Sequence, residues 1–395
     1  MKIERLDVYV IKVDQHDRFG AQANKPQTLG TSSYYFESEW REAYSTQSQS
    51  CFIRIETDNG LVGWGEAQAP LVPEVAGSLV RELLGPIVLG MDPRQPEVVF
   101  DRLYHSMNVR GHTTGFMLDA MAGIDLALWD IKGRAYNAPV CEVLGGPFRT
   151  RLPAYISGIR GASTEDRVQV SRKAATAGFS GVKAYLGRGV ARDEAEIRAL
   201  RAGLDAATDI ETDWFWKYDR SDALRLGRIA DELRLTWIES PLDPEDIAGH
   251  AALAQALDTP IAVGEPLRTT RQFLDWCRQE ALDIAQPDIL RTGITEGKKI
   301  ADIVHAHHRT IAPHSSIFLG TGTAATWHLS AAIPNFRVQE HQPPSFEITN
   351  RFVEPAMQVI DGELVVPLGP GLGVTVNEQK LASSVAQHWT VTKKA

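Results

Sequence analysis

From about residue 150 onward the sequence alternates between short apolar segments typical of strands and amphipathic segments typical of helices. The strand-like segments are 152–157, 181–186, 210–215, 235–239, 260–265, 282–288, 309–314 and 336–340. Amphipathic segments such as 194–207 and 298–308 separate them. Strands that alternate with helices form a parallel sheet with helical crossovers, and eight such units can close into a barrel. We therefore predict an α/β fold built on a (β/α) TIM-type barrel.

The residues before this region predict an α+β unit. Residues 1–14 alternate like a strand, and 50–67 contain two strand patterns around Asp58-Asn59-Gly60, a strong hairpin signal. Helical patterns follow at about 73–88, 95–107 and 114–136. Residues 17–40 are rich in turn formers and have no clear period, so we expect a lid or binding loop there.

The C-terminal residues carry another hairpin signal, Asp361-Gly362, and we expect them to return to the first unit. The expected organisation is therefore an α+β capping domain over 1–135, a barrel domain over 136–345 and a C-terminal segment over 346–395 that rejoins the capping domain.

Polar residues recur at the ends of the predicted strands. They are Lys183 and Tyr185, Asp213, Glu239, Glu265, Asp288, His314 and Glu340. From Asp213 the steps are 26, 26, 23, 26 and 26 residues, which by itself indicates only a repeating unit. Because the carboxyl ends of barrel strands open on the face that carries active sites, we expect these side chains to converge.

Asp213, Glu239 and Glu265 end three consecutive strands. Three carboxylates brought together would raise one another's pKa values unless a cation were present. Oxygen ligands without a nearby cysteine favour Mg²⁺, with Mn²⁺ as an alternative. The competing interpretation is that each acid forms a structural ion pair with an arginine.

Two further pairs have the residue types of acid–base groups. Asp288 ends the strand before the one that leads to His314, and a carboxylate behind an imidazole fixes its tautomer and raises its basicity. Lys183 and Tyr185 are two residues apart on one strand, so they point the same way, and the ammonium should lower the pKa of the phenol. For Tyr185 the alternative is packing inside the barrel.

Composition limits the partners and the location. The net charge of −9 disfavours nucleic acid and anionic membranes as partners, since both bind basic surfaces. Three widely spaced cysteines disfavour a disulfide scaffold. We find no signal-peptide pattern and no apolar run long enough to span a bilayer, and therefore expect a cytoplasmic protein.

Several of these motifs together resemble the enolase superfamily, and specifically its mandelate racemase subgroup. The resemblance covers essentially the whole chain: the "GWGEA" turn at 63–67, the helix at 120–146, the barrel, and "LVVPLGPGLGVTV" at 364–376, which is similar to the segment that returns to the cap.

The resemblance implies roles for the strand-end residues. Asp213, Glu239 and Glu265 match Mg²⁺ ligands that bind a substrate carboxylate and stabilise an enediolate. His314 with Asp288 matches a His-Asp dyad, and Glu340 matches an acid that hydrogen-bonds the enediolate. The family usually has Lys-x-Lys on the second strand, whereas this chain has Lys183-Ala184-Tyr185, and Asp213 is followed by Trp-Phe rather than a small residue and asparagine. A tyrosine at the position of the second lysine is similar to the pattern in a branch of acid-sugar dehydratases.

The function expected from this resemblance is Mg²⁺-dependent dehydration of a sugar acid, an aldarate or an aldonate, to a 2-keto-3-deoxy acid. The partner is then a small-molecule substrate, and we expect a homo-oligomer. A racemase, epimerase or cycloisomerase that uses the same intermediate is the alternative. A barrel that only binds a ligand is a third possibility, which loss of the three carboxylates would have indicated. The substrate, and whether Tyr185 or His314 is the base, stay open at this point.

Overall fold

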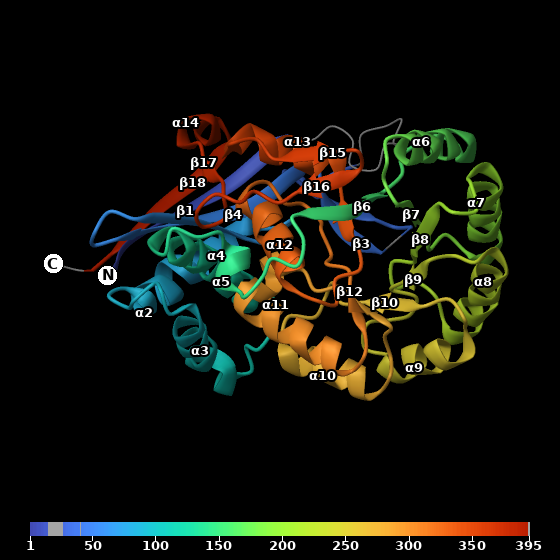
Figure 1. Ribbon diagram of the computed structural model, residues 1–395, viewed down its shortest axis with the longest axis horizontal. Coiled ribbons are helices and arrows are strands. Elements are labelled where there is room, and N and C mark those ends of the chain that lie inside the picture. The colour runs from blue at the N-terminus through green and yellow to red at the C-terminus, as the bar shows by residue number, and fades with distance from the viewer. Residues whose placement is uncertain (15–26, 40, 394–395) are drawn as a thin grey trace.

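The computed structural model describes residues 1–14, 27–39 and 41–393 (Figure 1). An antiparallel sheet with the strand order β18-β1-β4-β5 forms the capping domain. Its strands are β1 (Ile3–Asp14), β4 (Gln47–Thr57), β5 (Val62–Ala67) and β18 (Val385–Thr392). The predicted strand at 1–14 and the hairpin around Asp58-Asn59-Gly60 are both confirmed. The last strand of the chain, β18, pairs with β1.

Helices cover this sheet where the sequence predicts them. They are α1 (Pro73–Leu79), the π-helical turn η1 (Val80–Leu84), α2 (Gly85–Val88), α3 (Pro96–Met107) and α4 (Phe116–Ala135). The second glycine of "GWGEA" allows α4 to approach β5 closely. A Cβ on Gly65 would lie 1.9 Å from the carbonyl oxygen of Gly123. Only glycine permits this approach of helix to strand.

Eight parallel strands form the closed barrel. They are β6 (Arg151–Ser157), β7 (Gly181–Tyr185), β8 (Asp209–Asp213), β9 (Trp237–Glu239), β10 (Ile261–Val263), β11 (Ile284–Ala285), β12 (Thr310–Ile311) and β13 (Gln339–His341). Each pairs with the next from β6 to β12, β13 pairs with β6, and a bridge between Ile311 and Phe336 joins the two ends. The predicted barrel is therefore confirmed, with several strands shorter than expected.

Helices follow the strands and form the outer ring, most visibly at the right of Figure 1. They are α6 (Thr164–Thr176), α7 (Val190–Gly203), α8 (Arg220–Leu233), α9 (Ile247–Ala256), α10 (Thr270–Arg278), α11 (Ile289–Ala306) and α12 (Thr321–Ala332). Inside the barrel, Tyr155 and Trp237 pack in a buried apolar cluster with smaller residues of the neighbouring strands. The interior is thus filled, and the open space lies at the strand ends.

The C-terminal residues contact the barrel before they reach the cap. After α13 (Pro343–Phe352), β14 (Val353–Glu354) pairs with β17 (Thr375–Val376). The predicted turn at Asp361-Gly362 joins β15 (Gln358–Ile360) to β16 (Glu363–Val365), and β16 pairs with the first residues of β6. The short helix α14 (Glu378–Leu381) then precedes β18.

Glu66 of the "GWGEA" turn joins the capping domain to the barrel. Its carboxylate accepts the backbone N–H groups of Leu319, Gly320 and Gly322 at 2.7, 3.0 and 3.0 Å. These groups precede or begin α12, where unpaired N–H donors favour an anion. The cap is therefore held close to the open end of β12.

The expectation for residues 17–40 needs correction in part. Residues 15–26 and 40 lie outside the described residues, so the lid prediction there is untested. The described part is not an irregular loop, because β2 (Tyr34–Glu37) pairs with β3 (Glu42–Ser45) in an antiparallel hairpin. The alternating pattern of these two strands is short and is flanked by polar residues, so it does not stand out in the sequence. Among the described residues, no helix is both long and apolar enough for a membrane span.

Candidate active site

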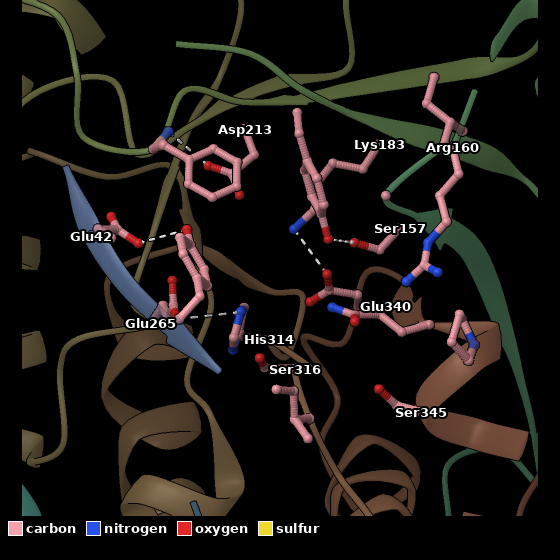
Figure 2. A pocket seen from close by; sticks show the side chains of 18 of the residues that line it. Glu42, Ser157, Arg160, Lys183, Asp213, Glu265, His314, Ser316, Glu340 and Ser345 are labelled. Atoms are coloured by element: carbon pink, nitrogen blue, oxygen red, sulfur yellow. Dashed lines mark hydrogen bonds and ion pairs between the residues drawn. The ribbon is translucent and has the colours of Figure 1, made fainter. Parts of the chain in front are cut away.

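A cavity of about 120 Å³ lies at the carboxyl ends of the barrel strands, as expected for this architecture (Figure 2). Six of the predicted site residues line it: Lys183, Tyr185, Asp213, Glu265, His314 and Glu340. The other two, Glu239 and Asp288, are buried behind this lining and contact it. The structure therefore brings the predicted residues together in two layers.

Asp213 and Glu239 are the last residues of β8 and β9, and Glu265 follows β10 by two residues. The three acids influence one another electrostatically. Burial raises the pKa of Asp213 well above its usual range, and the charges of Glu239 and Glu265 raise it further, against the effect of Lys183. The negative charges of Glu239 and Glu265 thus add to burial at Asp213, as expected for carboxylates brought close together.

The donor chemistry of these acids suits Mg²⁺, but their positions do not yet form a coordination sphere. No three His, Cys, Asp or Glu side chains within the described ranges are grouped closely enough to hold a metal ion. Glu239 instead accepts hydrogen bonds from Lys183 at 2.8 and 3.0 Å and from Gln286 at 2.7 Å. Glu265 pairs with Arg291 at 3.2 Å. Metal binding at these acids would therefore require some of their contacts to change.

Lys183 lies between two buried glutamates. Its ammonium is 2.9 Å from Glu340 Oε1 in addition to its contacts with Glu239, and its side chain is only 1% exposed. Burial lowers the pKa of Lys183, but the charges of the two glutamates outweigh burial and hold it well above its usual value. Lys183 therefore serves as a permanent cation that balances carboxylates on two separate strands.

Tyr185 does not have the lowered pKa that the sequence suggested. Burial raises the pKa of its phenol to about 12, and the opposing effect of Lys183 is smaller. The expectation failed because burial outweighs the charge of the lysine, and the charges of Glu340 and Asp213 act in the same direction as burial. The phenol oxygen lies 3.2 Å from Ser157 Oγ, and a Cβ on Gly158 (φ +71°) would lie 2.9 Å from the same oxygen. Tyr185 is thus held protonated in a closely packed position.

His314 and Asp288 form the predicted dyad. His314 Nδ1 lies 2.9 Å from Asp288 Oδ2, and backbone pairing between the two residues fixes their register. Asp288 also caps α11 by accepting the N–H of Leu290. Nε2 of His314 lies 3.8 Å from Glu265. Burial lowers the pKa of His314, but Glu265, Glu340 and Asp288 outweigh it and raise it to about 9.

Glu340 lies in β13, the last barrel strand, where the charges of Lys183 and His314 both act on it. Its Oε2 accepts the N–H of Ser315 at 2.6 Å. Burial raises its pKa, but Lys183 and His314 outweigh burial and keep the pKa below the usual value. In this arrangement Glu340 is ionised and acts as a counter-ion.

Sequence reasoning missed several residues of the site. Arg291, on the first turn of α11, contacts Glu265 and lies 3.7 Å from Asp288 Oδ2. It therefore connects one of the expected metal-binding carboxylates with the His-Asp dyad. Ser157, the last residue of β6, and Arg160, three residues beyond it, line the cavity. The predicted first strand, 152–157, ends in Ser157, so the strand-end pattern includes this serine, whereas Arg160 lies three residues beyond the strand and has no such signal.

The capping domain also contributes to the cavity. Glu42 and Tyr44 of β3 belong to the lining, and the phenol of Tyr44 donates a hydrogen bond to Glu42 at 2.8 Å. The turn of the same hairpin is tied to the barrel, since Glu39 pairs with Arg192 at 2.9 Å and with Arg188 at 3.4 Å. Nothing local in the sequence indicates that this hairpin reaches the barrel mouth.

Comparison with known families agrees with this geometry. Residues 39–145 match the family model of the mandelate racemase / muconate lactonizing enzyme N-terminal domain, and residues 165–380 match the enolase C-terminal domain-like model. The chain belongs to the mandelate racemase subgroup of the enolase superfamily. The resemblance noted from the sequence is thus confirmed, and with it the prediction of an enzyme with a capped barrel.

Two characterised relatives differ in reaction. The chain is 32% identical to a D-galactarolactone cycloisomerase of Agrobacterium fabrum, over 83% of this chain and 89% of the relative. It is 33% identical to an L-talarate/galactarate dehydratase of Salmonella typhimurium, over 77% of this chain and 73% of the relative.

Two solved structures share the fold. An enolase superfamily member from Agrobacterium tumefaciens has a TM-score of 0.92 at 30% identity, with 97% of this chain and 99% of that chain covered. The L-talarate dehydratase of Polaromonas sp. JS666, solved with Mg and L-glucarate, has a TM-score of 0.83 at 26% identity, with 100% and 99% covered.

Proposed function

We propose that this enolase superfamily member is a Mg²⁺-dependent hydro-lyase that removes water from a sugar acid and forms a 2-keto-3-deoxy acid. The observation that carries the proposal is the convergence of a His-Asp dyad and two of three strand-end carboxylates on one cavity. The dehydratases among the relatives support the reaction class.

Asp213, Glu239 and Glu265 are the residues that would hold Mg²⁺. Their oxygen donors suit a hard divalent cation, and so do the charges of Glu239 and Glu265, which add to the effect of burial in raising the pKa of Asp213. When bound, the ion supplies positive charge that opposes the charge developing on the substrate carboxylate as its α-proton is removed. The Mg-bound dehydratase structure supports this choice of ion.

His314 is the proposed acid–base group. Asp288 accepts a hydrogen bond from Nδ1, which leaves the Nε2 lone pair to take the proton from the carbon α to the carboxylate. The charge of Glu265 contributes to the raised pKa of His314, so offsetting that charge favours the basic form. The electron pair released at the α-carbon then forms the double bond to the β-carbon as the β-hydroxyl leaves. That hydroxyl takes the proton back from Nε2 and departs as water, and the enol product tautomerises to the ketone.

Lys183 and Tyr185 contribute in other ways. Lys183 balances part of the charge of Glu239 and Glu340 and so reduces their repulsion of a substrate carboxylate. Tyr185, with a pKa of about 12, donates a hydrogen bond rather than accepting a proton from carbon.

A cycloisomerase or epimerase is the second candidate, favoured by the 32% identical cycloisomerase and by the presence of both Tyr185 and His314 in the cavity lining. It would share proton removal with the dehydratase but would not release water. Product mass therefore separates the two reactions.

The test is a screen of aldarates and aldonates with the purified chain and Mg²⁺, with 2-keto acid measured as its semicarbazone. We expect at least one acid to be dehydrated, and we expect chelation with EDTA or the change Asp213→Asn to abolish the activity. The matched control is Asp302→Asn, since Asp302 is an exposed acid paired with Lys298 on α11. Product of unchanged mass would favour the isomerase, and full activity in EDTA would contradict the role of the metal.

A further inference from the structure

Arg291 closes a ring of charged side chains at the wall of the cavity. Its Nη2 lies 3.2 Å from Glu265 Oε1, and its Nε lies 3.7 Å from Asp288 Oδ2. The same two oxygens face His314, at 3.8 Å from Nε2 and 2.9 Å from Nδ1. Figure 2 shows the contact between Glu265 and the imidazole of His314 as a dashed line. Glu265 therefore lies between the dyad histidine and a largely buried arginine.

Arg291 is held in place by more than the carboxylate of Glu265. Its Nη1 donates a hydrogen bond to the main-chain carbonyl oxygen of Glu265 at 3.1 Å, and its side chain is only 13% exposed. Burial lowers the pKa of Arg291, but the charges of Glu265, Asp288 and Asp119 on α4 outweigh burial and hold it above its usual value. The guanidinium can therefore keep its position if the carboxylate of Glu265 turns away from it.

We propose that Arg291 is a positioning residue that pairs with Glu265 in the metal-free enzyme and weakens metal binding, so that the ion stays exchangeable. This inference rests on the proposed function, because it takes Glu265 as a metal ligand. The arginine competes with the ion for the carboxylate, and its positive charge repels a second cation nearby. Once the carboxylate binds the ion, Arg291 retains the main-chain carbonyl of Glu265 and the charge of Asp288.

Metal affinity tests this inference without substrate. The probe is Mn²⁺, because electron paramagnetic resonance measures its unbound form directly. We expect Arg291→Gln to bind Mn²⁺ about 10- to 100-fold more tightly than the wild-type chain, since a nearby positive charge has been removed. Arg291→Lys should bind Mn²⁺ with nearly the wild-type affinity, because the charge stays. The matched control is Arg309→Gln, which should not change the affinity. Arg309 pairs with Asp283 at the amino ends of β12 and β11, the barrel face opposite the cavity.

Tighter binding distinguishes this role from a merely structural one. Loss of a structural ion pair would loosen the site and weaken metal binding. Unchanged or weaker Mn²⁺ binding in a folded Arg291→Gln variant therefore overturns the inference, and circular dichroism establishes that the variant is folded.

If Arg291→Gln does not fold, a crystal structure of the wild-type chain with Mn²⁺ decides the inference. The carboxylate of Glu265 should then contact the ion, while the guanidinium of Arg291 remains on the main-chain carbonyl of Glu265. A carboxylate that still pairs with Arg291 beside a bound ion overturns the inference.

The reaction product tests the proposed function separately. Tighter Mn²⁺ binding in Arg291→Gln supports the role of Arg291 even if the product retains all its atoms, in which case the dehydratase assignment alone is wrong. Equal Mn²⁺ affinity in the variant and the wild-type chain overturns that role even if the wild-type enzyme dehydrates acid sugars.

Discussion

The ammonium of Lys183 on β7 lies 2.8 Å from Glu239 Oε1 on β9, and both side chains are buried, with β8 between the two strands. This contact connects a residue expected to act on the substrate with one expected to bind a metal ion. The same ammonium also contacts Glu340, so two acidic strand ends depend on a single cation.

Replacing Lys183 with methionine should therefore destabilise the protein by about 3–5 kcal/mol, since it leaves two buried carboxylates without their counter-ion. Urea unfolding without added metal measures the effect. Lys298→Met is the matched control, because Lys298 pairs with Asp302 at the surface and such pairs contribute under about 1 kcal/mol. A loss as small as that of the control would show that Lys183 is not needed to balance these acids.

The dyad and Tyr185 should respond differently to substitution. His314→Asn should lose both exchange of the substrate α-proton with D₂O and formation of the keto acid, because one imidazole serves both steps. Tyr185→Phe should retain exchange, since its phenol, with a pKa of about 12, is a poor base at neutral pH. Proton NMR in D₂O measures exchange directly. Exchange that is lost in Tyr185→Phe and retained in His314→Asn would assign the base to the tyrosine.

Asp288→Asn should lower kcat by about 10²- to 10⁴-fold, because the amide no longer stabilises the imidazolium or fixes its tautomer. Asp288 does not line the cavity, so the substrate Kd should change little. Titration of substrate and steady-state kinetics separate the two effects. A variant that bound weakly but turned over at the normal rate would contradict the positioning role.

Gly158→Ala should disturb Tyr185. The φ of +71° disfavours a side chain, and the new Cβ would meet the phenol ring. Gly111→Ala is the matched control, because Gly111 has a φ of +85° and no atom within 4 Å of the added Cβ. Both variants should lose about 1 kcal/mol from backbone strain, but only Gly158→Ala should also lower kcat/KM. Equal activity in both would show that Tyr185 has room to move.

Acid should destabilise the protein partly through His328 on α12. Burial lowers the pKa of this histidine to about 4, and its Nδ1 accepts the N–H of Cys141. Its folded pKa lies below its unfolded value, so its stabilising contribution is complete above about pH 6.5 and is lost as the pH falls toward 4. The loss amounts to about 3 kcal/mol. Unfolding of His328→Gln between pH 7 and 4 should show a correspondingly weaker pH dependence, and an unchanged slope would contradict this.

Periodic features of this chain could be predicted from the sequence. Alternation located the barrel strands, and turn residues located the hairpins at Asp58-Asn59-Gly60 and Asp361-Gly362. Because strand ends of a parallel barrel meet on one face, the same reasoning brought residues as distant as Lys183 and Glu340 together.

Contacts that depend on tertiary packing could not be predicted in this way. The hairpin that carries Glu42 belongs to another domain, and no local pattern encodes its approach to the barrel. The prediction of a lowered pKa for Tyr185 was wrong, because burial of the phenol and the pairing of Lys183 with glutamates arise only in the folded chain.

The most direct test of the account is a single reaction of the wild-type enzyme with Mg²⁺ and a panel of sugar acids in D₂O, followed by mass spectrometry and proton NMR. The account predicts, for at least one acid, a product that has lost one water and carries a 2-keto group with deuterium at the neighbouring carbon. Recovery of every acid with its α-proton unexchanged would contradict proton abstraction by His314, and with it the proposed function.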